Sequence, residues 1–109
     1  FSDPSLYKKS TTMQQLHDVL VGVSKNGTSK QLLDNSKTQI ASKTGTILAL
    51  NKDGYTSKQY VSAIVGYAPA ANPKYSCIVL IKCQKNATQY YGASVAGPVF
   101  KDILNEALK

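Results

Sequence analysis

The chain has 109 residues, the size of one ordinary domain, and 42% of them are hydrophobic, so a packed core is expected and general disorder is excluded. No apolar run approaches the roughly 20 residues that a membrane-spanning helix needs. The net charge is +7, with 13 basic residues that are all Lys. Because Arg is the usual side chain for bidentate contacts with bases and phosphates, its absence argues against sequence-specific nucleic-acid binding.

The N-terminal part of the chain predicts one amphipathic helix. Residues 1–9 are expected to be a connector, and the next apolar residues recur at helical spacing over residues 11–24. The apolar positions of this helix are Met13, Leu16, Val19, Leu20 and Val23. Asn26-Gly27 is expected to end the helix, and a further helical turn is expected over residues 29–34. His17 is expected at the border of the apolar face, without a catalytic role.

Three strands and a second helix are expected after residue 37. The strands are predicted over residues 38–48, 59–67 and 75–83. The unbroken apolar run inside the third strand is typical of a strand that is covered on both faces. The last helix is expected over residues 93–108, beginning near Ser94 so that Pro98 falls in its first turn. Its predicted apolar stripe comprises Val95, Val99, Phe100, Ile103, Leu104 and Ala107.

The short connections favour an α+β fold, in which a three-stranded antiparallel meander has an N-terminal helix and a C-terminal helix packed on the sheet. The first and third strands would be the sheet edges. Cys77 and Cys83 would lie about 20 Å apart along one strand, too far for a disulfide within it. Cys77 is therefore interpreted as core packing. His17 supplies no second metal ligand, so neither a metal site nor a cofactor is predicted.

Lys43-Thr44-Gly45-Thr46 is the most informative motif of the chain. It combines an ammonium group and two hydroxyls within the first predicted strand, where period 2 places Thr44 and Thr46 on one face. Such a strand suits an extended ligand with a carboxylate, which the ammonium attracts and the hydroxyls bind. Gly45 would let another backbone come close.

Four stretches in series carry a resemblance to a known family. They are Asn26-Gly27-Thr28, residues 40–46 (IASKTGT), residues 65–75 (VGYAPAANPKY) and residues 91–103 (YGASVAGPVFKDI). In this order and spacing, the chain resembles the C-terminal part of the transpeptidase domain of penicillin-binding proteins, most closely the division-type class B enzymes. The resemblance implies that the three strands belong to a larger transpeptidase sheet.

The resemblance also implies a function and a set of roles. The family crosslinks peptidoglycan stem peptides by serine acyl transfer, and penicillin acylates the same serine. Thr44 and Thr46 would hold the terminal carboxylate of the D-Ala-D-Ala stem peptide, and Lys43 would order the catalytic hydroxyl network. The Thr46 backbone N–H would form half of an oxyanion hole. The implied partners are the stem peptide, β-lactams and the rest of the domain, and the implied location is the extracytoplasmic face of the bacterial membrane.

The sequence departs from the family pattern at three places. The family usually has Gly where Ser42 stands, so a side chain there would either crowd the strand or be tolerated. Ser5-Leu6-Tyr7-Lys8 and Ser24-Lys25-Asn26 formally match the catalytic Ser-x-x-Lys and Ser-x-Asn elements, but neither lies in the right part of the fold. We therefore expect both elements to be absent and the isolated chain to be inactive.

Alternative interpretations remain open at this point. The chain could be a cationic module that binds a polyanion, or a structural piece that associates through its sheet edges. A phosphate-binding loop at Lys43-Thr44 is excluded, because that motif requires glycines where Lys37 and Ser42 stand. Because the chain begins at Phe1 and carries no secretory signal, we expect a processed or excised piece whose membrane anchor lies upstream.

Overall fold

The computed structural model describes residues 10–27, 30, 38–52 and 54–109. Its elements are α1 (Ser10–Asn26), β1 (Ala41–Asn51), β2 (Gly54–Ala68), β3 (Tyr75–Lys82) and α3 (Gly92–Ala107). This order confirms the α+β fold predicted from the sequence. The expected connector, the Ser5–Lys8 match and, apart from Lys30, the expected turn over residues 29–34 lie outside the described residues.

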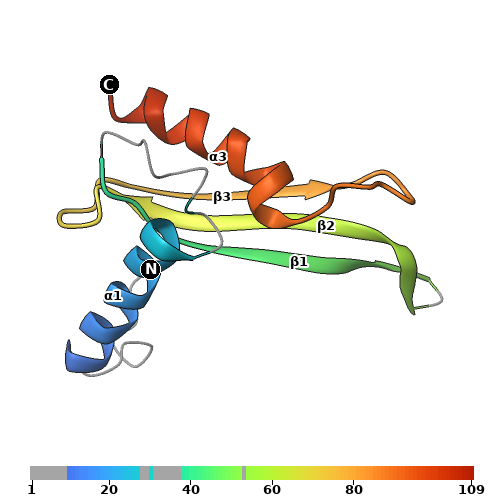
Figure 1. Cartoon of the computed structure of the whole chain (residues 1–109), viewed down its shortest axis with the longest axis horizontal. Helices are drawn as coiled ribbons and strands as arrows, with labels where there is room; N and C mark the ends of the chain where they lie inside the picture. Colours follow the sequence, from blue (N-terminus) through green and yellow to red (C-terminus); the bar gives the residue numbers. More distant parts are fainter. Residues whose placement is uncertain (1–9, 28–29, 31–37, 53) are drawn as a thin grey trace.

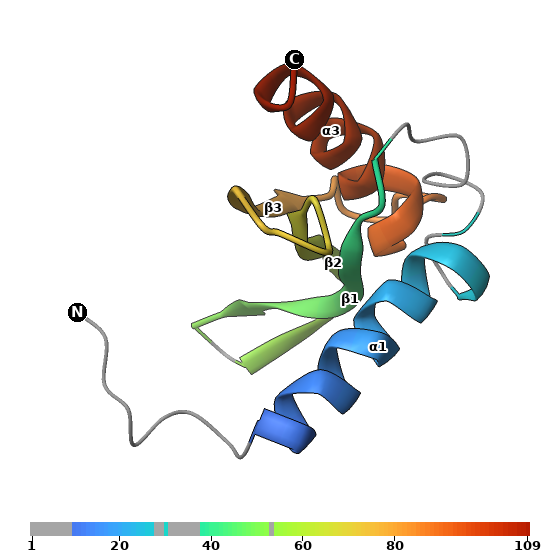
Figure 2. The same ribbon diagram turned by 90° about the vertical axis from the view of Figure 1, so that its left-hand side faces the viewer.

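The three strands form one antiparallel sheet in the order β1-β2-β3, so β1 and β3 are its edges within the described part of the chain. Figures 1 and 2 show α3 lying over one face of the sheet, while α1 lies beside β1 near the start of that strand. The predicted meander with two helices is therefore present, and β1, which carries the motif, is an edge strand.

The strand boundaries differ from the predictions at both ends of the β1–β2 hairpin. Residues before Ala41 do not pair with β2, because the Gln39 carbonyl accepts a hydrogen bond from the Ala70 N–H at 2.9 Å. At the other end the hairpin is longer than predicted, since Asn51 pairs with Gly54. The φ of Gly54 is 109°, a left-handed conformation that suits glycine. β1 thus covers residues 41–51 rather than 38–48, β2 begins at 54 rather than 59, and β3 ends at 82 rather than 83.

The core lies between α3 and the facing side of the sheet. Its buried members are Ile40, Ile64, Ala68, Val79, Ala96, Phe100 and Leu104. Cys77 packs against this core, as the sequence predicts, and burial raises the pKa of its thiol. Both cysteines are free.

The other face of β3 contradicts the sequence prediction. Ile78 and Leu80 are 65% and 60% exposed, although the apolar run suggested a strand covered on both faces. Side chains alternate along a strand, so α3 covers Val79 and its face while Ile78 and Leu80 point to the opposite side. No described element of this chain covers that side of β3.

α3 begins earlier than predicted and buries a different stripe. It starts at Gly92, so Pro98 lies inside the helix rather than in its first turn. The buried stripe follows the i, i+4 spacing and contains Gly92, Ala96, Gly97, Phe100 and Leu104. Val99 and Ile103, which were predicted on the packed stripe, are 41% and 46% exposed. Small residues near the start of α3 bring its backbone close to the sheet.

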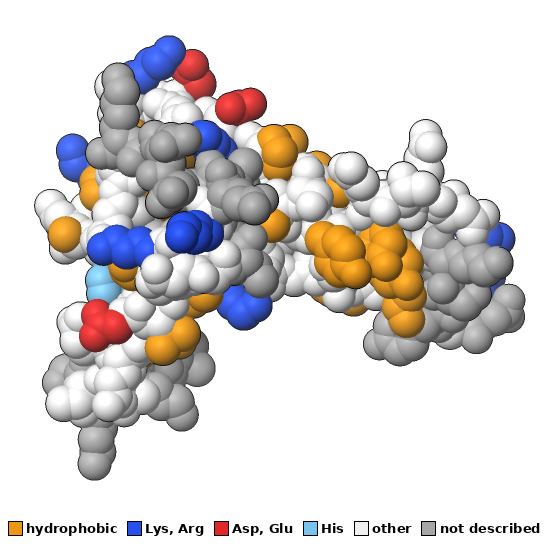
Figure 3. All heavy atoms as spheres, viewed as in Figure 1, with side chains coloured by type: hydrophobic (Ala, Val, Ile, Leu, Met, Phe, Trp, Pro, Cys, Tyr) orange, Lys and Arg blue, Asp and Glu red, His pale blue; other side chains and the backbone are white. Residues whose placement is uncertain are grey.

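The apolar stripe of α1 is only partly covered. Leu20 and Val23 are half-buried, whereas Met13, Leu16 and Val19 are exposed. In Figure 3, hydrophobic side chains remain visible over α1 and over the sheet, while Lys side chains lie in several separate places. No helix in the described ranges is both long and apolar enough to span a membrane.

Gly66 of β2 gives a test of how closely β1 and α3 pack around this strand. A Cβ at Gly66 would lie 2.3 Å from the Ala41 carbonyl oxygen and 2.9 Å from Phe100 Cζ. Gly66→Ala is expected to lower the free energy of unfolding by about 1–3 kcal/mol, because overpacking forces the backbone to shift. Urea denaturation measures this change.

Gly22→Ala in α1 is the matched control, since a Cβ there meets no atom within 4 Å. It is expected to raise stability by about 1 kcal/mol, the usual gain of Ala over Gly within a helix. Equal effects of the two substitutions would contradict the packing seen at Gly66.

Candidate functional site

The β1–β2 register fixes how the motif is presented. Thr44 pairs with the buried Ile64, and Thr46 pairs with Ser62, so both threonines share the face that α3 covers. This agrees with the shared face that strand alternation predicts. Lys43 and Gly45 point to the opposite face.

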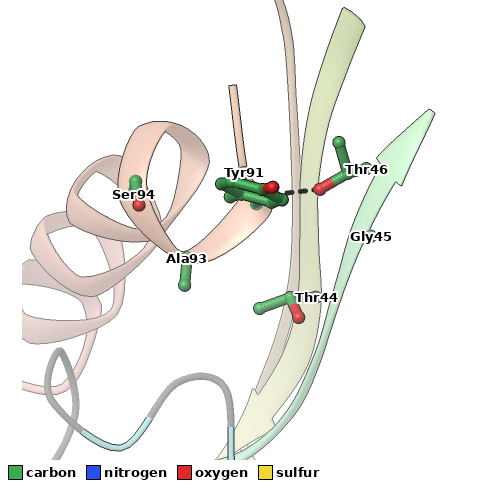
Figure 4. Close-up of a pocket in the computed structure, with 7 residues that line it drawn as sticks. Thr44, Gly45, Thr46, Tyr91, Ala93 and Ser94 are labelled. Carbon is green, nitrogen blue, oxygen red and sulfur yellow. Dashed lines mark hydrogen bonds between the residues drawn. The ribbon is translucent and has the colours of Figure 1, made fainter. Parts of the chain in front are cut away.

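A pocket of about 430 Å³ lies between this strand and the beginning of α3. It is lined by Thr44, Gly45, Thr46, Tyr91, Gly92, Ala93 and Ser94. Figure 4 shows the Thr44 and Thr46 side chains on the strand, with Tyr91 and the first turn of α3 across from them. The pocket therefore combines two hydroxyls from an edge strand with the N-terminal turn of a helix.

The first residue of α3 is tethered to the motif. The Gly92 N–H donates a hydrogen bond to Thr46 Oγ1 at 3.2 Å, drawn as the dashed line in Figure 4. A hydroxyl can accept one hydrogen bond and still donate its own proton, so Thr46 retains a donor for a ligand. A Cβ at Gly92 would lie 2.2 Å from the Ala63 carbonyl oxygen and 2.7 Å from that of Gly45. Only glycine permits this contact between helix and strand.

Ser62 of β2, the strand paired with the motif, also forms hydrogen bonds to the beginning of α3. Its side chain is fully buried, donates a hydrogen bond to the Tyr91 carbonyl at 3.0 Å and accepts one from the Ala96 N–H at 3.1 Å. Neither Ser62 nor Gly92 was predicted as a site residue. A polar residue within an otherwise apolar central strand is the signal that could have identified Ser62.

Three tyrosines stack beside the pocket. The Tyr60 and Tyr90 rings lie 3.9 Å apart between centroids, and the Tyr90 and Tyr91 rings 4.7 Å apart. The hydrogen bond with Tyr90, followed by charge repulsion from that residue, raises the pKa of Tyr91. Tyr91 is 60% exposed and forms part of the pocket wall.

Lys43 does not line the pocket. Its ammonium group is exposed and donates a hydrogen bond to the Thr44 carbonyl at 2.8 Å. The charge thus sits on the strand that carries the two threonines, on the face opposite the hydroxyls.

Ser42 does not crowd the strand. It is buried, and its hydroxyl lies 2.7 Å from the hydroxyl of Ser24, so the side chain that replaces the usual glycine is accommodated with a hydrogen bond. Ser24 is itself buried and is not among the residues that line the pocket.

His17 lies at the half-buried border of α1, as predicted. Its Nδ1 is 2.6 Å from the Tyr67 hydroxyl, and burial raises the pKa of Tyr67. This pair lines a separate, more open hollow of about 750 Å³ between α1 and the β2–β3 loop. Among the described residues, no three His, Cys, Asp or Glu side chains come together as a group that could hold a metal.

The chain is similar to known proteins of one family. Residues 5–105 match the family described as the penicillin binding protein transpeptidase domain. The chain is 41% identical over 71 residues to peptidoglycan D,D-transpeptidase FtsI of Buchnera aphidicola, covering 65% of this chain and 12% of that protein. It is 32% identical over 100 residues to the probable peptidoglycan D,D-transpeptidase PenA of Neisseria flavescens, covering 92% of this chain and 25% of that protein.

A solved structure shares the fold. Penicillin-binding protein A of M. tuberculosis, in its ceftriaxone acyl-enzyme complex, superposes with a TM-score of 0.74 and 26% identity, over 91% of this chain and 21% of that one. The fold and the sequence therefore define a transpeptidase-type α+β unit. The chain belongs to the penicillin-binding protein transpeptidase family, and its likeness to FtsI and PenA confirms the expected class B relationship. It spans an eighth to a quarter of the length of these two relatives.

Gly92→Ala tests whether α3 is seated on the motif as described. The added methyl would meet backbone oxygens of Ala63 and Gly45, so the helix start must move and the hydrogen bond to Thr46 is weakened. We expect a loss of about 1–3 kcal/mol in the free energy of unfolding, measured by urea denaturation.

Gly45→Ala is the control for this prediction, because its Cβ would make an ordinary 3.7 Å contact with Ala63 Cβ. The fold is expected to tolerate this change within about 1 kcal/mol, the range of β-propensity differences. If Gly92→Ala proved as mild as Gly45→Ala, α3 would not be seated on the strand as described.

Proposed function

We propose that this chain is the C-terminal portion of a peptidoglycan D,D-transpeptidase, which crosslinks stem peptides by serine acyl transfer during cell-wall synthesis and division. The observation that carries the proposal is the pocket on an edge strand, where Thr44 and Thr46 face the first turn of α3. Membership of the penicillin-binding protein transpeptidase family supports it.

β1 supplies the substrate-binding strand in this proposal. The Thr44 and Thr46 hydroxyls hold the terminal carboxylate of a D-Ala-D-Ala stem peptide or of a β-lactam, and the peptide extends along β1, an edge strand of the described sheet, by β-augmentation. Gly45 keeps this strand open to another backbone.

Electrostatics and hydrogen bonding assist the acyl transfer. The Thr46 backbone N–H is one of two oxyanion-hole donors, a kind of group that contributes about 3–4 kcal/mol to lowering the barrier. Lys43 supplies positive potential from the opposite face of the strand, and the hydroxyls that it orders are those contributed by the rest of the domain rather than those of Thr44 and Thr46. The Gly92 N–H fixes the Thr46 side chain so that its hydroxyl proton points to the ligand.

The nucleophilic serine and its Ser-x-x-Lys and Ser-x-Asn partners come from the rest of the domain. The uncovered apolar face of β3 supports the presence of further domain elements, because the exposed side chains of Ile78 and Leu80 are suited to pack against them. We place the complete protein at the extracytoplasmic side of the bacterial membrane, anchored by an N-terminal helix, where its peptidoglycan substrate lies. No cofactor or nucleic acid takes part.

A labelled-penicillin experiment tests the assignment. After incubation and denaturing electrophoresis, the complete protein is expected to carry a covalent label, whereas the isolated 109-residue chain is expected to carry none because it lacks the nucleophile. A complete protein without label would refute the transpeptidase assignment. Label on the isolated chain at Ser5 would refute the assignment of the nucleophile to the rest of the domain.

Thr46→Val in the complete protein tests the carboxylate contact. The substitution keeps the branched shape but removes the hydroxyl, so the second-order rate of acylation by benzylpenicillin is expected to fall about tenfold to hundredfold, the equivalent of a hydrogen bond to a charged group. Stopped-flow measurement gives this rate.

Two controls separate the carboxylate contact from a general effect. The methyl ester of benzylpenicillin lacks the carboxylate, so its slow acylation is expected to be insensitive to Thr46→Val. Ile47→Val trims the neighbouring exposed residue of the same strand and is expected to leave both rates unchanged. An equal loss with acid and ester would contradict the assigned role of Thr46.

A further inference from the structure

Two serine hydroxyls meet in the interior just before the motif. Ser24 Oγ and Ser42 Oγ lie 2.7 Å apart, and the two residues are only 5% and 1% exposed. Removing one member of a buried hydrogen-bonded pair is destabilising, because the remaining hydroxyl loses a partner that bulk water cannot replace. The pair is therefore a constraint on the relative position of the two segments that carry it.

The pair joins the end of α1 to the beginning of β1. Ser24 lies in the last turn of α1, and Ser42 is the second residue of β1, directly before Lys43. The bond thus connects the helix with the strand through side chains, 18 residues apart in sequence. The residue that it fixes is the immediate neighbour of the motif.

The start of β1 is held on its other sides as well. Ala41 is fully buried, and the strand lies so close to Gly66 that a Cβ there would be 3.1 Å from Ser42 Cα. Further along β1 the side chains of Thr46 and Ile47 are exposed. The buried beginning of the strand therefore sets the position of the open segment that follows.

Ser42 is one of the positions at which the chain departs from the usual family pattern. The family strand that β1 resembles has glycine where Ser42 stands, and a glycine would offer no hydroxyl to Ser24. In this chain the departure from the pattern is matched by a buried partner on α1. Neither serine lines the pocket at Thr44–Thr46, so neither is a catalytic residue.

We propose that Ser24 and Ser42 form a positioning pair that sets, through the backbone of β1, where Lys43 and Thr44 lie relative to the substrate. This inference rests on the proposed transpeptidase function. It also gives Ser24 a role that differs from the one its formal Ser-x-Asn match suggests, since Ser24 is buried and hydrogen-bonded to the strand.

The test measures acylation of the complete protein by a fluorescent penicillin in stopped flow, which separates the non-covalent Kd from the acylation rate constant. Ser24→Ala and Ser42→Ala are each expected to slow acylation about tenfold, the effect of a sub-ångström misplacement of reacting groups. The Kd is expected to rise by a smaller factor than the acylation rate constant falls, because Thr44 shifts with the strand while Thr46, farther from the pair, still holds the carboxylate.

Three further variants complete the comparison. The double variant Ser24→Ala/Ser42→Ala is expected to be no slower than either single variant, because both substitutions remove the same bond. Ser24→Thr keeps the hydroxyl and is expected to retain the wild-type rate. Ser76→Ala removes an exposed hydroxyl on β3 and is the matched control, with no expected change.

The outcomes distinguish this inference from the proposed function. If the wild-type protein is acylated and the Ser24→Ala and Ser42→Ala variants lose thermal stability but acylate at the wild-type rate, the pair only packs and the inference is wrong. Independent, multiplicative losses in the double variant would also overturn it. If the wild-type protein itself is not acylated, the proposed function is wrong and the inference fails with it.

Discussion

The contact of the α3 backbone with the sheet is the constraint on which the candidate site depends. Gly92 lies against the carbonyl groups of Gly45 and Ala63, closer than any residue with a Cβ could come. Ser62 completes this contact by bonding both the residue before the helix and the N–H of Ala96. The pocket exists because these contacts place the first helix turn beside Thr44 and Thr46. Phe100 and Leu104, which are buried farther along α3, extend the contact between the helix and the sheet.

Much of this arrangement could be predicted from the sequence. Hydrophobic spacing gave the two helices, β-branched runs gave the three strands, and strand alternation placed Thr44 and Thr46 on one face. These predictions succeeded because each depends on local periodicity. The resemblance to the transpeptidase family also depends on short motifs in series, and the match over residues 5–105 agrees with it.

The predictions that the structure contradicts concern positions where tertiary contacts override the local sequence pattern. The start of α3 was expected near Ser94 because Pro98 suits a first turn, yet bonds from the sheet to Gly92 and Ala96 fix the start earlier. The apolar run of β3 was interpreted as a strand covered on both faces, but composition cannot tell which covering elements the same chain provides. The hydrogen bond between Ser24 and Ser42 links segments 18 residues apart and leaves no periodic trace in the sequence.

The strand order β1-β2-β3 has a consequence for how such a domain can change. β1, which is proposed to bind substrate, is one edge strand of the described sheet. β3, which has the uncovered apolar face, is the other. β2 alone separates them and pairs with both, and the β1–β2 register shifts between Leu48 and Leu50, beyond the motif. Substitutions on the exposed face of β3, where the rest of the domain is proposed to pack, can therefore accumulate without changing β1, provided that β2 and the turn at Gly92 are kept. Substrate recognition and domain assembly can then evolve at separate rates within one small sheet.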